Sequence, residues 1–307
     1  MAFQRAESME EKIFDGSFFR GLNRIKIVTR ITMQGGRSGM RKSAAKGSSV
    51  EFADFREYVP GDDIRRIDWN TYGRMEKLFV KLFVEEREAY YSIIVDASAS
   101  MDFGHPSKSV CAARLAGAIS YMALNNLDRV RLSAICEDKI INSSDFTGRQ
   151  GFNKAALWLE NMEFFGKTNL YKSVRGIPFN QRGVTVIISD LFSKDTTDEN
   201  INSIVDMIRY LKYMKQEVLI LHVLSPEEIE PTLEGTIGLL DSETGDILKV
   251  TATSHLCKQY KHVLKKFTDR VEECAKHYQA HYIPICSDET IETFIYKGIR
   301  SGQLENI

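Results

Sequence analysis

The chain has 307 residues, enough for one large domain or two modest ones. Hydrophobic residues make up 43% and charged residues 27%, which are ordinary values for a globular protein. The formal net charge is −1, which excludes a general electrostatic attraction to nucleic acid or to a membrane surface.

Targeting and disulfide signals are weak. No apolar run approaches the roughly 20 residues that a membrane span needs, so none is expected. The start, MAFQRAESMEEK, has no apolar middle like that of a signal peptide. Five cysteines are an odd number and are widely spaced, which argues against a disulfide framework and against a CxxC zinc site. The expected compartment is therefore the reducing cytoplasm.

Residues 1–89 lack regular strand–helix alternation and are predicted to form an N-terminal extension. Residues 17–32 have helix-like apolar spacing, and residues 78–87 are typical of a strand. Residues 35–49 are rich in Gly, Ser and cations, which indicates a basic loop. Residues 1–50 carry ten Lys and Arg against four Asp and Glu. The pattern favours a solvated arm over a surface for an anionic partner such as nucleic acid.

The stretch PGDDIRRIDW, residues 60–69, begins with a Pro-Gly turn signal. One interpretation is a solvated turn in which its own charges pair. The alternative is a docking surface, or an internal ligand that covers a site elsewhere in the chain. The first interpretation is favoured, and it predicts pairing of Asp62, Asp63 and Asp68 with Arg65 and Arg66.

Strands and helices alternate from residue 90 to 307, the second predicted domain. Strands are expected at 90–97, 129–136, 183–191, 217–225 and 281–286, with a partner strand within 138–146 and a hairpin at 235–251. Helices are expected at 107–127, within 153–165, at 198–215, at 254–280 and after the last strand. This alternation predicts an α/β, Rossmann-like fold with a mostly parallel sheet and helices on both faces.

Oxygen-bearing side chains follow the strands of this predicted sheet. Asp96, Ser98 and Ser100 come directly after the first strand, and Asp190 ends another. Thr168 lies in a glycine-containing loop just before that second strand. Ligands in open α/β sheets bind at the carboxyl ends of the strands, so we expect these residues to converge. Carboxylates and hydroxyls suit a hard cation, Mg²⁺ first, with Mn²⁺ or Ca²⁺ possible.

Asp96-x-Ser98-x-Ser100, Thr168 and Asp190 together resemble the metal-ion-dependent adhesion site of von Willebrand factor type A domains. The stretch from Val50 to Arg74, running into VDASASM, resembles the bacterial family 58 of domains of unknown function. The first resemblance implies Mg²⁺ held by the two serines, with Thr168 joining directly or through water and both aspartates nearby. The second implies a module that works beside a MoxR-type AAA+ ATPase, with no established catalysis.

Three catalytic interpretations compete for the same residues, and each lacks a part. A serine nucleophile at Ser98 needs a base, and the nearest in sequence is His105. An aspartyl-phosphate enzyme would place a second acid where Ser98 stands. A P-loop would need glycine at position 161, where the chain has Asn161. No catalytic constellation is therefore predicted.

The expected function is metal-dependent protein–protein interaction. A partner, a MoxR-type AAA+ ATPase or its client, would supply an acidic side chain to an open coordination position. The alternatives are a metal-dependent phosphohydrolase, or nucleic-acid binding through the basic arm.

Overall fold

The computed structural model describes residues 13–14, 16–22, 25–27, 50–85, 88–137, 139–179, 181–193, 197–232, 235–240, 247–302 and 304–306. The basic loop predicted at 35–49 lies outside these residues. The chain forms two compact units, Met1–Thr32 with Ala89–Ile307, and Met33–Glu88. The predicted boundary at residues 89 and 90 lies one residue from their junction. Residues up to Thr32, however, belong to the larger unit rather than to a separate extension.

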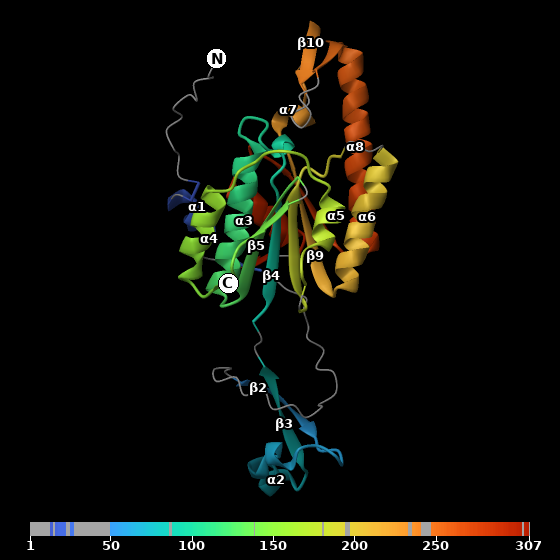
Figure 1. Ribbon diagram of the computed structural model, residues 1–307. Coiled ribbons are helices and arrows are strands. Elements are labelled where there is room, and N and C mark those ends of the chain that lie inside the picture. The colour runs from blue at the N-terminus through green and yellow to red at the C-terminus, as the bar shows by residue number, and fades with distance from the viewer. Residues whose placement is uncertain are drawn as a thin grey trace. The chain divides into compact units, whose positions relative to one another are not determined.

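The larger unit is built on a seven-stranded sheet (Figure 1). Five strands run parallel in the order β12-β9-β8-β4-β5, and β6 and β7 pair antiparallel with β5. All seven residues of β8 are buried, as expected for an apolar strand that is covered on both faces. The strands are β4 (Tyr90–Asp96), β5 (Arg129–Cys136), β6 (Lys139–Asn142), β7 (Phe146–Thr147), β8 (Gly183–Ser189), β9 (Gln216–Leu224) and β12 (His281–Cys286).

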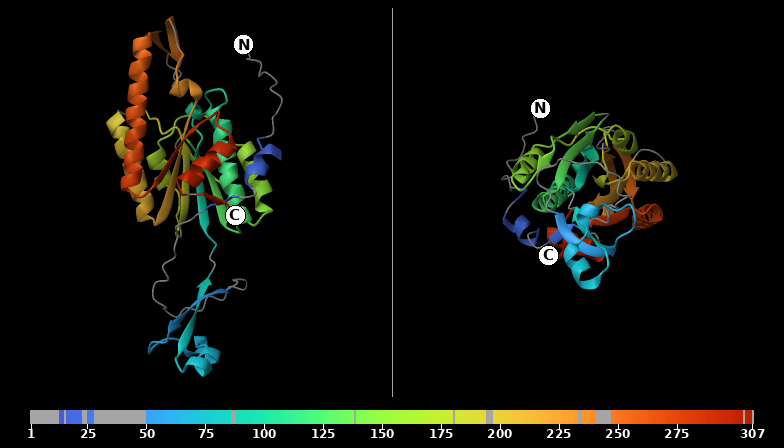
Figure 2. Two further views of the ribbon diagram at one scale, coloured as in Figure 1. Left: turned by 180° about the vertical axis from the view of Figure 1, so that it is seen from behind. Right: turned by 90° about the horizontal axis from the view of Figure 1, so that it is seen from below.

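Helices cover both faces of this sheet (Figures 1 and 2). One face packs against α1, α3, α4 and α9, and the other against α5, α6 and α8, with an apolar core on each side. The helices are α1 (Gly16–Leu22), α3 (Lys108–Asn125), α4 (Gly151–Glu160), α5 (Leu170–Arg175), α6 (Thr197–Tyr213), α7 (Pro226–Ile229), α8 (Ser254–His277) and α9 (Ile291–Arg300). The predicted α/β fold, with a mostly parallel sheet and helices on both faces, is confirmed.

The sheet changes direction of winding at β4. The chain passes from β4 to β5 on one side and later returns to β8 on the other side of β4. The neighbouring strands β4 and β8 therefore form the topological switch point of the sheet, which is where α/β folds bind their ligands. Asp96 ends β4, and Asp190 directly follows β8. The fold thus places both predicted aspartates at the switch point.

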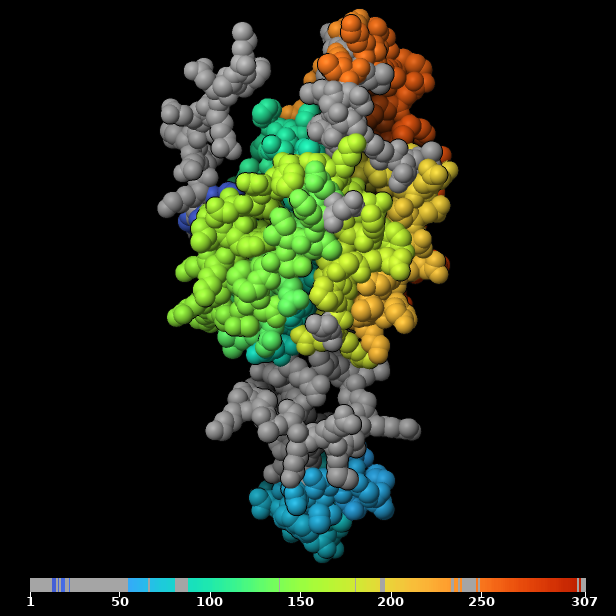
Figure 3. Space-filling view, viewed as in Figure 1, coloured from blue at the N-terminus to red at the C-terminus, as the bar shows by residue number. Residues whose placement is uncertain are grey.

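The predicted hairpin at residues 235–251 is confirmed. Strands β10 (Gly235–Leu240) and β11 (Ile247–Ala252) pair antiparallel between α7 and α8. Two short helices, α5 and α7, were not expected from the sequence. In Figure 3, the segment from α4 to α6 forms the near face of the larger unit.

The helix expected over residues 17–32 is wrong beyond its first part. Helix α1 ends at Leu22, and β1 (Ile25–Ile27) pairs antiparallel with β13 (Leu304–Asn306). Phe18 and Leu22 are buried against the core, where aromatic rings of α1, α3 and α4 pack edge to face. The apolar residues after Leu22 therefore serve a strand that pairs with the other end of the chain.

The smaller unit is a two-stranded antiparallel sheet with one short helix. It contains β2 (Val50–Glu57), the 3₁₀ turn η1 (Ile64–Arg66), α2 (Trp69–Met75) and β3 (Phe79–Glu85). The strand at β3 was predicted and β2 was not. Ile67 and Val80 are buried in it, whereas Trp69 is 62% exposed and Met75 65% exposed.

Of the charge pairing predicted within PGDDIRRIDW, the part that involves Asp62 is wrong. Asp62 pairs with Arg56, outside the stretch, at 2.8 Å. Asp63 accepts a hydrogen bond from the backbone N–H of Arg65 and caps η1. Asp68 accepts from the N–H groups of Asn70 and Thr71 and caps α2. A carboxylate just before a helix satisfies free N–H groups, so these acids serve as helix caps.

Gly183, where β8 begins beside β4, tests this packing. A methyl group at this position would overlap the carbonyl oxygen of Tyr90, a backbone atom that cannot move without separating the strands. We expect Gly183→Ala to lower the free energy of unfolding by about 3 kcal/mol, measured by chemical denaturation. Gly73→Ala on α2, where nothing lies within 4 Å of the added methyl, is the control and should cause no loss. Equal stability of the two variants would contradict this account of the β4–β8 contact.

Candidate metal-binding site

Asp96 is buried where β4 ends, and local hydrogen bonds fix its carboxylate. Its Oδ1 accepts from the backbone N–H of Ser98 at 3.1 Å, and its Oδ2 accepts from the Ser189 hydroxyl at 2.7 Å. Ser189 ends β8, so this contact joins the two strands of the switch point. Among the described residues no cation pairs with Asp96.

Two serine hydroxyls lie together just after Asp96. Ser98 precedes the 3₁₀ turn η2 (Ala99–Met101), and its Oγ is 3.0 Å from the Oγ of Ser100. Neighbouring ligands of an octahedral Mg²⁺ ion, with bonds of ~2.1 Å, are ~3.0 Å apart. The two hydroxyls therefore already have the spacing of adjacent Mg²⁺ ligands.

Thr168 is brought to the same edge by a loop that binds the segment after β4. The N–H of Phe165 donates to Ala97, and the N–H of Ala99 donates to the carbonyl of Gly166. Thr168 Oγ1 donates to the carbonyl of Ile135 at 3.3 Å, and the N–H of Ala97 uses the same carbonyl. Thr168 thus lies beside the start of the Asp96–Ser100 segment.

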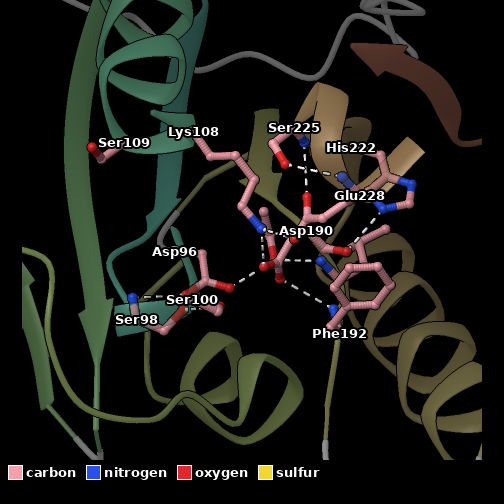
Figure 4. A network of polar contacts seen from close by, with 12 residues as sticks. Asp96, Ser98, Ser100, Lys108, Ser109, Asp190, Phe192, His222, Ser225 and Glu228 are labelled. Atoms are coloured by element: carbon pink, nitrogen blue, oxygen red, sulfur yellow. Dashed lines mark hydrogen bonds and ion pairs between the residues drawn. The ribbon is translucent and has the colours of Figure 1, made fainter. Parts of the chain in front are cut away.

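Asp190 is held by a buried lysine that sequence reasoning missed (Figure 4). Lys108, the first residue of α3, places its Nζ 2.8 Å from Asp190 Oδ2 and 2.6 Å from Glu228 Oε1. The side chains of Lys108 and Asp190 are 0% and 1% exposed. Burial alone would lower the pKa of Lys108, but Asp190 and Glu228 outweigh burial and raise that pKa. Lys108 is therefore a charged ammonium inside the protein.

The carboxylates of the site outnumber its one cation. Asp96, Asp190 and Glu228 carry three negative charges when ionised, and Lys108 carries one positive charge. Burial raises the pKa of Asp96, and the nearby charge of Asp190 raises it further. Burial also raises the pKa of Glu228, which Lys108 opposes. Asp96 is thus the carboxylate whose charge is least compensated.

His222 fixes the backbone at Asp190 and is itself neutral. Its Nε2 is 2.8 Å from the carbonyl oxygen of Asp190, which can only accept, so Nε2 carries the hydrogen. Its Nδ1 then accepts from the Tyr282 hydroxyl at 2.6 Å. Burial lowers the pKa of His222 to about 4. A neutral imidazole can make both of these hydrogen bonds at once.

The loop between η2 and α3 is attached to its neighbours. The N–H of His105 donates to Glu227 at 3.1 Å, and the Ser287 hydroxyl donates to the carbonyl of Pro106 at 2.6 Å. Gly104 has φ of 91°, and a methyl there would overlap the side chain of Ser225. The loops after β4, β9 and β12 therefore form one connected edge.

These residues fit the chemistry of a hard divalent cation held through hydroxyl oxygens. The hydroxyl spacing, the uncompensated charge of Asp96 and the all-oxygen donor set agree with it. A cavity of about 40 Å³ adjoins Asp96 and Thr168, with room for water. Within the described part of the chain, no group of three or more His, Cys, Asp and Glu side chains is placed to hold a metal. Ser98, Ser100 and Thr168 would supply neutral hydroxyl oxygens to a metal bound beside Asp96.

The geometry of the site offers little support for the rival catalytic interpretations. Among the described residues, the Ser98 hydroxyl contacts that of Ser100, and no histidine hydrogen-bonds to either serine. His105 contacts Glu227 through its backbone instead. The Gly166-Lys-Thr168 loop follows a helix rather than a strand, so it lacks the setting of a P-loop.

All five predicted site residues lie at the carboxyl-end edge of the sheet. Lys108, Glu228 and His222 are additional. Lysine is almost never fully buried unless it is paired, so a lysine at a helix start predicts a surface position. Its partners lie 82 and 120 residues away in the chain, and no local pattern marks them.

Comparison with solved structures gives similarities at low identity. An aerotolerance-related membrane protein from Bacteroides fragilis aligns with a TM-score of 0.44 and 15% identity, covering 70% of this chain and 98% of its own. BatB from Bacteroides thetaiotaomicron aligns with a TM-score of 0.41 and 15% identity, covering the same shares. The SpRpn10 VWA domain aligns with a TM-score of 0.38 and 12% identity, over 68% and 93%. In the described residues no helix is long and apolar enough to cross a membrane.

Sequence comparison gives the family. Uncharacterized proteins Mb1516 of Mycobacterium bovis and Rv1480 of Mycobacterium tuberculosis are each 28% identical over 244 residues, which are 76% of this chain and 73% of theirs. The model of the family described as "Protein of unknown function DUF58" matches residues 54–269. That match covers well over half of the chain and parts of both units. The chain belongs to the DUF58 family.

Proposed function

We propose that this protein is a metal-dependent protein–protein interaction module, with the metal bound at the edge formed by Asp96, Ser98, Ser100, Thr168 and Asp190. The observation that carries the proposal is the pairing of a buried, uncompensated carboxylate with two hydroxyls spaced like Mg²⁺ ligands. Burying an unpaired charge is costly, and a divalent cation beside Asp96 would offset that cost.

The residues of the chain have different roles at the proposed metal site. Ser98, Ser100 and Thr168 supply neutral oxygens, and Asp96 supplies the compensating charge. Asp190 is kept in place by Lys108. The metal, when bound, supplies a coordination position that a carboxylate from outside can fill.

The surface beside the site indicates what kind of partner residue fits. Phe103 is 47% exposed and Phe192 is 38% exposed, and both rings lie about 6 Å from the Lys108 ammonium. They come from the loops that follow η2 and Asp190. A partner segment with an acidic side chain flanked by apolar residues would contact both the bound metal and these two rings.

The partner class rests on resemblance. Residues 50–101 resemble the family associated with MoxR-type AAA+ ATPases, and family membership supports that association. We propose a MoxR-type ATPase, or a client on which it acts, as the source of the acidic side chain.

A pull-down from native lysate tests this function. Wild-type protein with Mg²⁺ is expected to recover an AAA+ ATPase, and EDTA should abolish recovery. Ser98→Ala/Ser100→Ala should also abolish it, since both hydroxyl ligands are lost. Thr236→Ala/Thr251→Ala, which removes an exposed hydroxyl pair 3.5 Å apart on the β10–β11 hairpin, is the matched control and should retain recovery. Recovery that is indifferent to EDTA and to loss of the two serine hydroxyls would overturn metal-dependent docking.

Asp96→Asn separates the charge of Asp96 from its shape. Because burial and Asp190 disfavour the Asp96 carboxylate, removing its charge should stabilise the metal-free protein at neutral pH. The same change should eliminate the increase in melting temperature that Mg²⁺ causes in the wild type. Thermal unfolding with and without Mg²⁺ measures both effects. A variant that is less stable without metal, yet still responds to Mg²⁺, would contradict the assigned role of Asp96.

A further inference from the structure

Lys108 occupies a position at the site where its charge must affect any bound metal. Its ammonium is 2.8 Å from Asp190 Oδ2. Asp190 directly follows Ser189, whose hydroxyl donates to Asp96 at 2.7 Å, so Asp190 lies beside Asp96 at the ends of neighbouring strands. The other oxygen of Asp190 accepts from the N–H of Phe192 at 3.2 Å. Both oxygens of Asp190 are thus already occupied by donors of the chain.

The lysine cannot easily leave this position. Glu228 holds it from the other side at 2.6 Å, and Glu228 is itself fixed because its second oxygen accepts from the N–H of Ser225 at 2.8 Å. The Ser225 hydroxyl accepts from the N–H of Glu228 in return, which forms a capping box at the start of α7. Figure 4 shows the lysine side chain extending from α3 to this pair of carboxylates.

We propose that Lys108 is a tethered cation that shares Asp190 with the metal and thereby weakens the intrinsic affinity of the site for a divalent cation. This inference rests on the proposed function. Two cations that share one carboxylate repel each other, and the repulsion is strong where water is excluded. The site therefore has a low affinity for its metal until a partner supplies a further carboxylate.

The reciprocal consequence is a coupling between the two ligands. If a partner's carboxylate raises the affinity for the metal, the metal raises the affinity for the partner by the same factor. Lys108 sets the size of that factor, since it determines how much negative charge the chain alone offers to the metal.

The test is the affinity for Mn²⁺, with free Mn²⁺ counted by electron paramagnetic resonance in the absence of any partner. Lys108→Met/Glu228→Gln removes the ammonium together with one carboxylate, so the net charge is unchanged and Asp190 becomes available. We expect this double variant to bind Mn²⁺ about tenfold more tightly than the wild type. Lys276→Met/Glu272→Gln makes the same change in a Lys–Glu pair near the end of α8, joined at 2.6 Å, and should leave the affinity unchanged.

A second variant guards against misfolding of the first. Glu228→Gln alone keeps the Lys108–Asp190 pair and leaves the ammonium opposed by one carboxylate fewer. It should bind Mn²⁺ several-fold more weakly than the wild type, the opposite direction from the double variant. Circular dichroism and the unfolding midpoint establish which variants are folded.

The outcomes separate this inference from the proposed function. Equal Mn²⁺ affinity in the wild type and both variants would overturn the role of Lys108 and leave metal-dependent docking intact. Weaker binding by the folded double variant would also overturn it. The absence of Mn²⁺ binding in every variant at millimolar concentration would overturn the proposed function, and the role of Lys108 with it.

Discussion

The buried ion pairs of Lys108 are the interactions on which the candidate metal-binding edge of this protein depends. The lysine begins α3 and ties that helix to the loop after β8 and to helix α7. Removing one partner of a buried ion pair leaves an uncompensated charge, which typically costs several kcal/mol. The lysine therefore does more than neutralise Asp190. It fixes the segments that follow β4, β8 and β9 relative to one another. The two serine hydroxyls lie at the start of the first of these segments.

The same constraint explains why the site is asymmetric. Two aspartates follow neighbouring strands, yet only Asp190 has a cation of the chain beside it. Asp96 instead receives neutral donors, a backbone N–H and the Ser189 hydroxyl. Neutral hydrogen bonds favour a carboxylate less than an ammonium does. Asp190 is therefore paired within the structure, whereas Asp96 is the aspartate that is available to a cation from outside.

The fold, and the position of the five predicted residues at one edge of the sheet, could be inferred from the chain because their signals are local. Apolar runs that end at Asp96 and Asp190 mark the strands, and parallel strands carry their ends to one edge. What was missed depends on distant contacts. Strand β1 has three residues and exists because β13, near the other end of the chain, pairs with it. Lys108 is buried because of partners far along the sequence. The acids of PGDDIRRIDW were assigned to ion pairs because composition reveals charge but not backbone geometry; the structure uses two of them as helix caps.

The pairing of β1 with β13 has a consequence for how the chain can be divided. Strand β1 precedes the smaller unit and β4 follows it, and both strands belong to the larger unit. The smaller unit is therefore an insertion within one domain rather than a terminal domain. A single cut in either connection would leave the two units covalently joined, since the other connection remains. The insertion can instead be excised by design, by joining residue 32 to residue 89 through a linker. The DxSxS-bearing unit and the PGDDIRRIDW-bearing unit could then be supplied separately to the same partner.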